Sequence, residues 1–336
     1  MKHRLSDLYI LALITVVIVL LMSVLNPRQF LTIANLESMA FQLPELGLLS
    51  MAMMITMLTG GINLSIIATA NMTGIVAALI LTSGHSQGPA DVSVGTLLLA
   101  ISAGLAVAIV IGLINGLLIA LLGVSPILAT LGMMTLVDGL GIVFTRGYVV
   151  SGFPEAIRFL GNGTVAGIPF GVFLLALAAL LLAVLLNRTS FGFNIYMIGC
   201  NPTATYFSGV NNNTVIIRTY ILSSVYAGFA ALIMMSRFNS VSSAYGKSYL
   251  LITILCSVLG GISASGGFGR VSGLILALTV LQIVSSGLNL LQVSSFLTIA
   301  IWGCIIVIVM AINYLVFRFQ ERSMSIKRGL LSNLVG

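Results

Sequence analysis

The chain has 336 residues, of which 59% are hydrophobic and only 6% are charged. A soluble domain carries about 25% charged residues, so this chain cannot cover a surface that faces water. The composition excludes a soluble globular protein and indicates an integral membrane protein. The net charge of +7 does not indicate nucleic-acid binding, because the basic residues are scattered and gather at the ends of apolar runs, where they meet lipid headgroups.

The apolar runs are continuous rather than alternating, which predicts an all-α membrane protein and argues against a β-barrel. At roughly 20 residues for each span, the length allows about ten transmembrane helices in a single domain, 1–336. Segment 28–43 mixes polar and apolar residues, and we expect it to lie outside the membrane. The first apolar run is expected to be a retained span, because no small-x-small cleavage site follows it. The expected spans are about 8–25, 45–59, 62–82, 95–121, 126–145, 170–186, 214–235, 249–265, 271–290 and 296–316.

Ten spans place both termini and the polar loop 187–213 on the same side of the membrane. Nine basic residues fall on that side and five on the other. The first group is Lys2, Arg4, Arg188, Arg218, Arg270, Arg318, Arg322, Lys327 and Arg328, and the second is Arg28, Arg146, Arg158, Arg237 and Lys247. Because basic residues favour the cytoplasmic side, we expect both termini, the loop 187–213 and the tail 317–336 to be cytoplasmic.

Two glycine-rich segments match each other and predict interrupted helices. Gly60-Gly61-Ile62 with Ser65 recurs as Gly260-Gly261-Ile262 with Ser265, and Thr73-Gly74 corresponds to Ser272-Gly273. Interrupted helices at matching places in two halves point to a translocation site, because non-helical backbone at membrane depth needs protein or water around it. The alternative is coincidence, since this tripeptide is common in glycine-rich membrane chains. The second segment is no phosphate-binding loop, because a glycine stands where that loop needs lysine.

The polar residues within the expected spans are mostly amides and hydroxyls, which suit a neutral polyhydroxylated solute better than an ion. Asp138 is the exception: it is either functional, because an ionisable group at depth is costly, or it lies near an outer rim. The candidates for the solute pathway are Asn63, Ser65, Asn71, Asn115, Ser263 and Ser265. Thr73, Gln282 and Asp138 are further polar residues within the expected spans. A ladder of small residues, expected to pack against another helix, comprises Ala100, Gly104, Ala108, Gly112, Gly116 and Ala120.

The loop 187–213 contains a helix-start signal. Asn201 can cap a helix that begins at Pro202, and Gly209 stands where a left-handed C-terminal cap would fall. We therefore predict a short helix over Pro202–Ser208, which either docks on a partner or merely connects two spans.

Catalytic and metal-binding signals are weak. The cysteines Cys200, Cys256 and Cys304 are odd in number and two lie in apolar runs, so neither a disulfide framework nor a metal site is expected. No paired carboxylates or His–acid pair occur in the spans, and we expect a transporter without a cofactor rather than an enzyme.

Several motifs resemble one family. The loop contains Phe191-Gly192, Ile195-Tyr196, Ile198-Gly199, Asn201-Pro202, Ala204 and Ser208-Gly209; elsewhere stand Gly60-Gly61-Ile62-Asn63-Leu64-Ser65, Gly260-Gly261-Ile262-Ser263 with Ser265-Gly266-Gly267-Phe268-Gly269, and Gly287-Leu288-Asn289-Leu290-Leu291 with Val293-Ser294-Ser295-Phe296. These resemble the ribose-type permeases, the membrane subunits of ATP-binding-cassette sugar importers. The chain departs from the family pattern at Asn63 (family Asp), at Thr203 (Glu) and at Ile66-Ile67 (Val-Gly).

The resemblance implies a permease in the bacterial inner membrane that carries a small neutral sugar, a pentose or hexose. It implies a separate ATP-binding subunit, a periplasmic or lipid-anchored sugar-binding protein, and a second permease in a homodimer or heterodimer. The ATP-binding subunit would dock at Asn201, Pro202, Thr203, Ala204, Ser208 and Gly209. The alternative reading is a secondary transporter driven by protons through Asp138.

Overall fold

The computed structural model describes residues 2–82, 93–294, 296–307 and 311. These residues belong to two compact units, Met1–Gln292 and Val293–Gly336, which we describe separately. The expected tail 317–336 and the end of the tenth expected span lie outside the described residues.

The first unit is almost entirely helical. Its helices are α1 (Lys2–Leu25), α2 (Ile33–Met57), α3 (Ile66–Thr82), α4 (Val94–Ala120), α5 (Pro126–Thr145), α6 (Glu155–Asn162), α7 (Phe170–Arg188), α8 (Ser190–Cys200), α9 (Pro202–Phe207), α10 (Asn212–Phe238), α11 (Tyr249–Leu259) and α12 (Val271–Leu290). Its strands are β1 (Val150–Ser151), β2 (Thr164–Val165), β3 (Ile168–Pro169) and β4 (Ser240–Val241). β1 pairs antiparallel with β4, and β2 with β3. The second unit contains the apolar helix Phe296–Val307.

Within the described part of the chain, six helices are long and apolar enough to cross a membrane: α2, α4, α5, α7, α10 and α12. Shorter apolar helices are Leu11–Leu25 within α1, α3, α11 and Phe296–Val307. The expectation of a mostly helical membrane protein is confirmed at this level.

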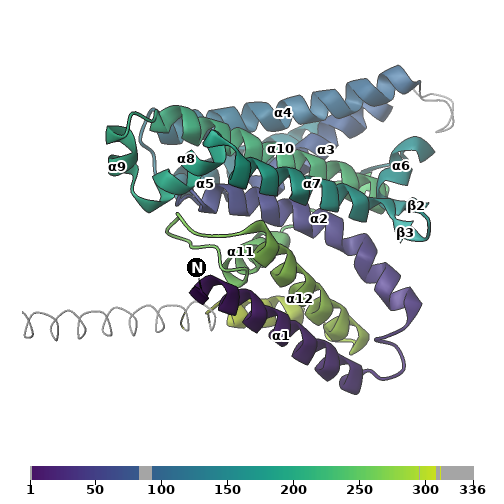
Figure 1. Cartoon of the computed structure of the whole chain (residues 1–336). Helices are drawn as coiled ribbons and strands as arrows, with labels where there is room; N and C mark the ends of the chain where they lie inside the picture. Colours follow the sequence, from purple (N-terminus) through teal and green to yellow (C-terminus); the bar gives the residue numbers. More distant parts are fainter. Residues whose placement is uncertain (1, 83–92, 295, 308–310, 312–336) are drawn as a thin grey trace, which may run out of the picture. The chain divides into compact units, whose positions relative to one another are not determined.

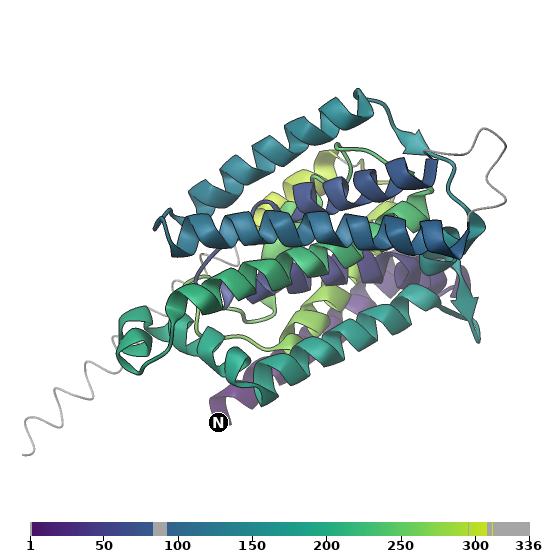
Figure 2. The same ribbon diagram turned by 90° about the horizontal axis from the view of Figure 1, so that it is seen from above.

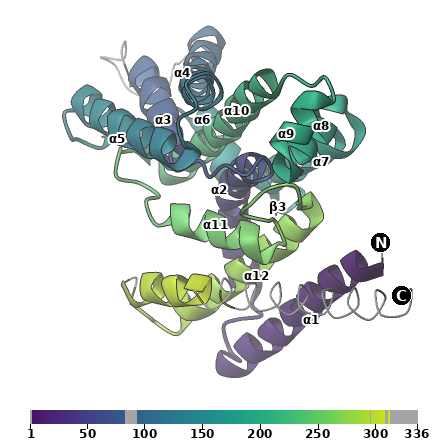
Figure 3. The same cartoon turned by 90° about the vertical axis from the view of Figure 1, so that its left-hand side faces the viewer.

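Helix α2 forms the centre of the first unit. Every residue from Pro44 to Met57 is buried, and Figure 3 shows α2 surrounded by other helices when the unit is viewed along the helix axes. It packs against α7, α10, α11 and α12. Burial on all sides explains why the segment from Pro44 to Met57 is mostly apolar without a distinct polar face.

The small residues of α4 pack closely against two helices. A Cβ at Gly112 would lie 2.8 Å from Ile221 Cα, and one at Gly116 would lie 2.7 Å from Ile217 Cα, both in α10. A Cβ at Gly104 would lie 2.9 Å from the carbonyl oxygen of Thr73 in α3. Because glycine lets helix backbones approach closely, the prediction of a packing role is confirmed at these positions.

The first unit has two distinct ends (Figure 1). α8 and α9 lie at one end, together with the start of α1, and α6 with the short strands lies at the other. Figure 2 shows the long helices running side by side between them. We call the end with α8 and α9 the α9 end, and the end with α6 and the short strands the α6 end.

The structure corrects the start of the second span. Segment 28–43 was expected to lie outside the membrane, but α2 begins at Ile33, where Thr32 caps it by accepting from the backbone N–H of Asn35 at 3.3 Å. Pro44 lies inside the helix, and its ring is accommodated against Gly171 of α7, where a Cβ would lie 2.9 Å from Pro44 Cγ. Proline normally breaks a helix, which is why the sequence pattern predicted a later start.

The polar loop 187–213 holds more structure than expected. Besides the predicted short helix, it contains α8, which Thr189 caps by accepting from Gly192 N at 3.1 Å. A Cβ at Gly192 would collide with Leu185 O, so α8 folds back closely on the last turns of α7.

Candidate functional site

Two glycine-rich segments connect successive helices. Segment 58–65 connects α2 to α3, and segment 260–270 connects α11 to α12. Both contain residues in the left-handed region: φ is +81° at Gly60 and +79° at Gly261. Side chains other than glycine adopt this region at a cost, so the local backbone explains the choice of residue. Gly61 and Gly260 serve close approach instead: a Cβ at Gly61 would collide with the Tyr220 hydroxyl, and one at Gly260 would lie 2.9 Å from Leu274 Cα.

The two segments meet each other at the α9 end. The backbone N–H of Gly267 donates to Leu58 O at 2.9 Å, and a Cβ at Gly266 would lie 2.7 Å from Gly60 N. Gly199 of α8 lies against both segments, because a Cβ there would collide with Leu58 O and Gly267 N. We call Gly60, Gly199, Gly266 and Gly267 the glycine junction. Gly199, three positions before the start of α9, thus lies directly against both non-helical segments.

Three of the expected pathway residues lie together in a buried network. Asn63 Oδ1 accepts from both the backbone N–H and the hydroxyl of Ser65, at 3.1 and 2.7 Å. Asn115 Nδ2 of α4 donates to Ser65 Oγ at 2.9 Å. Asn63 Nδ2 donates to Ser223 Oγ of α10 at 3.1 Å, and Ser223 Oγ donates to Ala52 O of α2 at 2.8 Å. All four polar side chains are fully buried, so the network links segment 58–65 to α2, α4 and α10.

Some polar atoms beside this network have no partner among the described residues. They are Asn115 Oδ1, the Tyr220 hydroxyl and the Ser224 hydroxyl, all buried. Buried polar atoms are normally paired. The interface between α4 and α10 therefore contains buried polar atoms near Asn63 that make no hydrogen bond within the described residues.

The other expected pathway residues lie elsewhere. Ser263 and Ser265 belong to segment 260–270, and their exposed hydroxyl oxygens are 2.9 Å apart. Asn71 lies in the middle of α3, where its Nδ2 donates to the carbonyl oxygens of Ser243 and Tyr245 at 3.1 and 2.9 Å. Asn71 therefore holds the connection between α10 and α11, residues 239–248.

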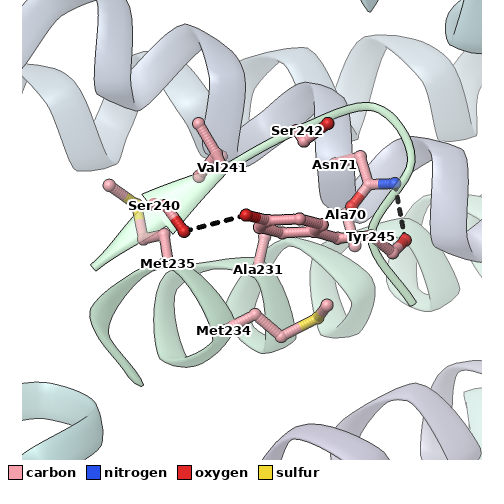
Figure 4. A pocket seen from close by; sticks show the side chains of 10 residues that line it. Ala70, Asn71, Ala231, Met234, Met235, Ser240, Val241, Ser242 and Tyr245 are labelled. Carbon is pink, nitrogen blue, oxygen red and sulfur yellow. Dashed lines mark hydrogen bonds between the residues drawn. The ribbon is translucent and has the colours of Figure 1, made fainter. Parts of the chain in front are cut away.

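A small cavity lies beside Asn71 (Figure 4). It is lined by side chains from α3, from α10 and from the α10–α11 connection, where Tyr245 and Ser240 hydroxyls are 3.0 Å apart. Its volume is about 10 Å³, which is room for about one water molecule. A sugar does not fit there.

The predicted short helix is confirmed. α9 runs over Pro202–Phe207, and Asn201 caps it by accepting from Ala204 N at 3.0 Å. Ser208 ends the helix, and Gly209 follows with φ of +83°. Tyr206 and Phe207 are 66% and 81% exposed. The two rings lie side by side at the end of α9, with their centroids 5.8 Å apart.

Asp138 lies near the α6 end and has a charged neighbour. Its Oδ2 is 3.9 Å from Lys247 Nζ of the α10–α11 connection, and the two side chains are 25% and 63% exposed. Asp138 is therefore partly exposed and paired.

Sequence reasoning missed Glu45, whose carboxylate is fully buried in α2. Its Oε1 accepts from the Tyr249 hydroxyl at 2.7 Å and lies 3.4 Å from Arg237 Nη2. Arg237 and Tyr249 lie at opposite ends of the α10–α11 connection. One oxygen of Glu45 therefore contacts both ends of this connection and holds them against α2. An acidic residue at the edge of an expected span was the available signal.

Within the described residues, no group of three or more His, Cys, Asp or Glu side chains could hold a metal ion. The site is built from amides, hydroxyls, backbone groups and two ion pairs.

Residues 35–312 match the model of the branched-chain amino acid transport system permease component. The chain belongs to this family. Among its relatives, the ribose import permease protein RbsC of Bacillus subtilis (strain 168) is 35% identical over 299 residues, which cover 88% of this chain and 89% of the relative. No solved structure matches the chain.

Two further members of the permease family come from Escherichia coli (strain K12). The D-allose transport system permease protein AlsC is 29% identical, covering 92% of each chain. The galactose/methyl galactoside import permease protein MglC is 30% identical, covering 92% of this chain and 94% of its own. The expected resemblance to ribose-type permeases is confirmed, and all three relatives are named as permeases of sugar or sugar-derivative transport.

Proposed function

We propose that this chain is the permease subunit of an ATP-driven importer in a bacterial inner membrane, and that it moves a small neutral sugar of the pentose or hexose class. A separate ATP-binding subunit hydrolyses the ATP, and a periplasmic or lipid-anchored binding protein delivers the sugar. A second permease, identical or different, completes the membrane part. The relatives transport ribose, allose and galactose or methyl galactoside, as their names say, and this supports the sugar class.

The observation that carries the proposal is the contact of Gly199, in α8 just before α9, with both non-helical segments. α9 presents exposed aromatic side chains at one end of the unit, while Gly199 lies against segments 58–65 and 260–270. A force applied to α9 would reach both non-helical segments without crossing a long helix. We assign the ATPase contact to Asn201, Pro202, Thr203, Ala204, Ser208 and Gly209.

In this proposal the α9 end is cytoplasmic, both termini lie on that side, and the α6 end faces the periplasm. About ten helices cross the membrane, with interruptions at Gly60-Gly61 and Gly260-Gly261. Asn63, Ser65, Asn71, Asn115, Ser263 and Ser265 supply polar groups near the solute pathway. The buried network around Asn63 supports this role, because its polar groups pair with one another in a closed state of the pathway. In this proposal they become available to the solute when segments 58–65 and 260–270 move.

An α9 variant tests the ATPase contact. Ala204 is exposed on α9, so we expect Ala204→Trp to leave the fold intact and to obstruct docking by its bulk. The affinity for the ATP-binding subunit should fall by at least about tenfold, equivalent to about 1.4 kcal/mol, with loss of solute-stimulated ATP hydrolysis. The measurement is co-purification and ATP hydrolysis in the reconstituted complex.

The matched control is Ala106→Trp, on the exposed face of α4, which should assemble normally. Normal transport by Ala204→Trp in the presence of the ATP-binding subunit would mean that α9 only connects α8 to α10.

A further inference from the structure

The Asp138–Lys247 pair is unusual because of where it lies. Asp138 belongs to α5, an apolar helix long enough to cross a membrane. It lies seven residues before the end of that helix at Thr145, or about 10 Å along the axis. Thr135, three residues before Asp138 on the same side of α5, is exposed, while Leu136, Leu140 and Ile142 nearby are exposed and apolar. Asp138 is therefore a partly exposed charge on a largely apolar helix surface.

Lipid is a poor neighbour for this pair. A charged side chain at membrane depth costs several kcal/mol unless it meets water, protein or an opposite charge. Here Lys247 is only a weak partner, because its Nζ is 3.9 Å from Asp138 Oδ2 and its side chain is 63% exposed. An aqueous space or another protein chain would satisfy the exposed side of this pair.

The pair is not needed to hold the α10–α11 connection in place, because other contacts do so. Asn71 Nδ2 donates to two carbonyl oxygens of the connection, and Asn239 Oδ1 accepts from Phe153 N at 3.0 Å. Glu45 fastens both ends through Arg237 and Tyr249. Where the connection passes α5, a Cβ at Gly141 would lie 3.3 Å from Ser243 Cβ. The α10–α11 connection thus packs tightly against α5 without help from the ion pair. Asp138 and Lys247 both keep exposed surface that could contact another molecule.

We propose that Asp138 and Lys247 together bind hydroxyl groups of the transported solute near the periplasmic entrance. This inference rests on the proposed function and assigns it a contact site. The carboxylate accepts hydrogen bonds and the ammonium donates them, and charge-assisted hydrogen bonds of this kind are the stronger ones. The pair is neutral as a whole, so it gives no net attraction to an anionic or a cationic solute. The arrangement fits an uncharged polyhydroxylated solute with both donors and acceptors.

The test compares uptake of labelled ribose by the complete complex in proteoliposomes, with the binding protein loaded and saturating. Asp138→Asn keeps the shape but removes the charge, and Lys247→Met removes the donor. We expect each to reduce the rate of uptake per assembled complex about tenfold, the effect of losing one hydrogen bond to a charged group. Asp138→Glu, which keeps a carboxylate, should recover part of the rate.

The matched control is Glu37→Gln, because Glu37 is an exposed carboxylate on α2 outside this site; its uptake should be unchanged. If the wild-type complex takes up ribose normally and both Asp138→Asn and Lys247→Met do so equally well, the inference is wrong. The proposed function would then still stand. Loss of assembly with the second permease in these variants also overturns the inference, in favour of a contact between chains. If the wild-type complex takes up ribose only with a proton gradient and without ATP, the proposed function fails, and the inference fails with it.

Discussion

At the scale of single residues, Asn63 shows how the chain replaces a charge by a hydrogen-bonding group. The resemblance to ribose-type permeases leads to the expectation of Asp here, but this chain has Asn. Its Oδ1 accepts twice from Ser65, and its Nδ2 donates to Ser223. Asp would keep the first role but lose the second, because a carboxylate cannot donate.

We therefore expect Asn63→Asp to retain part of the uptake and Asn63→Leu to lose it. Leu leaves the Ser65 donors unpaired in a fully buried position, at a cost of about 1–3 kcal/mol for each unpaired group. Uptake of labelled sugar and the apparent unfolding temperature in detergent measure the two effects. Full uptake by Asn63→Leu would place this network away from the pathway and leave it a packing role.

At the scale of elements, Glu45 joins three helices through one carboxylate oxygen. It lies in α2, while Arg237 is in the last turn of α10 and Tyr249 is the first residue of α11. The carboxylate is fully buried, and its Oε2 has no hydrogen-bond partner among the described residues. Such a group depends on its positive partner for stability.

We expect Arg237→Met to destabilise the protein by about 3 kcal/mol, because it leaves a buried carboxylate without its counter-charge. Adding Glu45→Gln should restore most of the loss, since the amide oxygen can still accept from Tyr249. The measurement is the apparent unfolding temperature of the purified permease. Arg158→Met, an exposed arginine of α6 at the same end, serves as the control; an equal loss in both variants would show that the effect is not specific to this ion pair.

At the scale of the whole molecule, the direction of the chain across the membrane decides which end meets which partner. Cys200 is exposed at the α9 end and Cys256 is buried. In the proposed orientation an impermeant thiol reagent labels Cys200 in inverted vesicles and not in intact spheroplasts. Cys304, in the apolar helix Phe296–Val307, is also exposed and could react. The variant Cys200→Ser is therefore the control, because any labelling that remains in it does not come from Cys200.

Labelling of Cys200 from outside would reverse the orientation. The ATP-binding subunit could then not reach α9, and the Asp138–Lys247 pair would lie on the wrong side for an entrance.

The sequence by itself determined the features that depend on composition or on neighbours a few residues apart. The scarcity of charge predicted a membrane protein, and Asn201, Pro202 and Gly209 predicted α9 because helix caps act within one turn. The glycine pairs marked where helices stop, since backbone conformation is a local property. The motifs also indicated the permease family, which the match over residues 35–312 confirmed.

Only the tertiary structure decided which of these groups meet. Asn63 and Ser223 are 160 positions apart, and the glycine junction joins Gly60, Gly199 and Gly267 from three separate segments. Pro44 inside α2 and the three-way contact of Glu45 likewise depend on neighbouring helices. Such contacts follow from how buried helices pack, and packing is set by the shape of the whole core rather than by any one stretch of sequence.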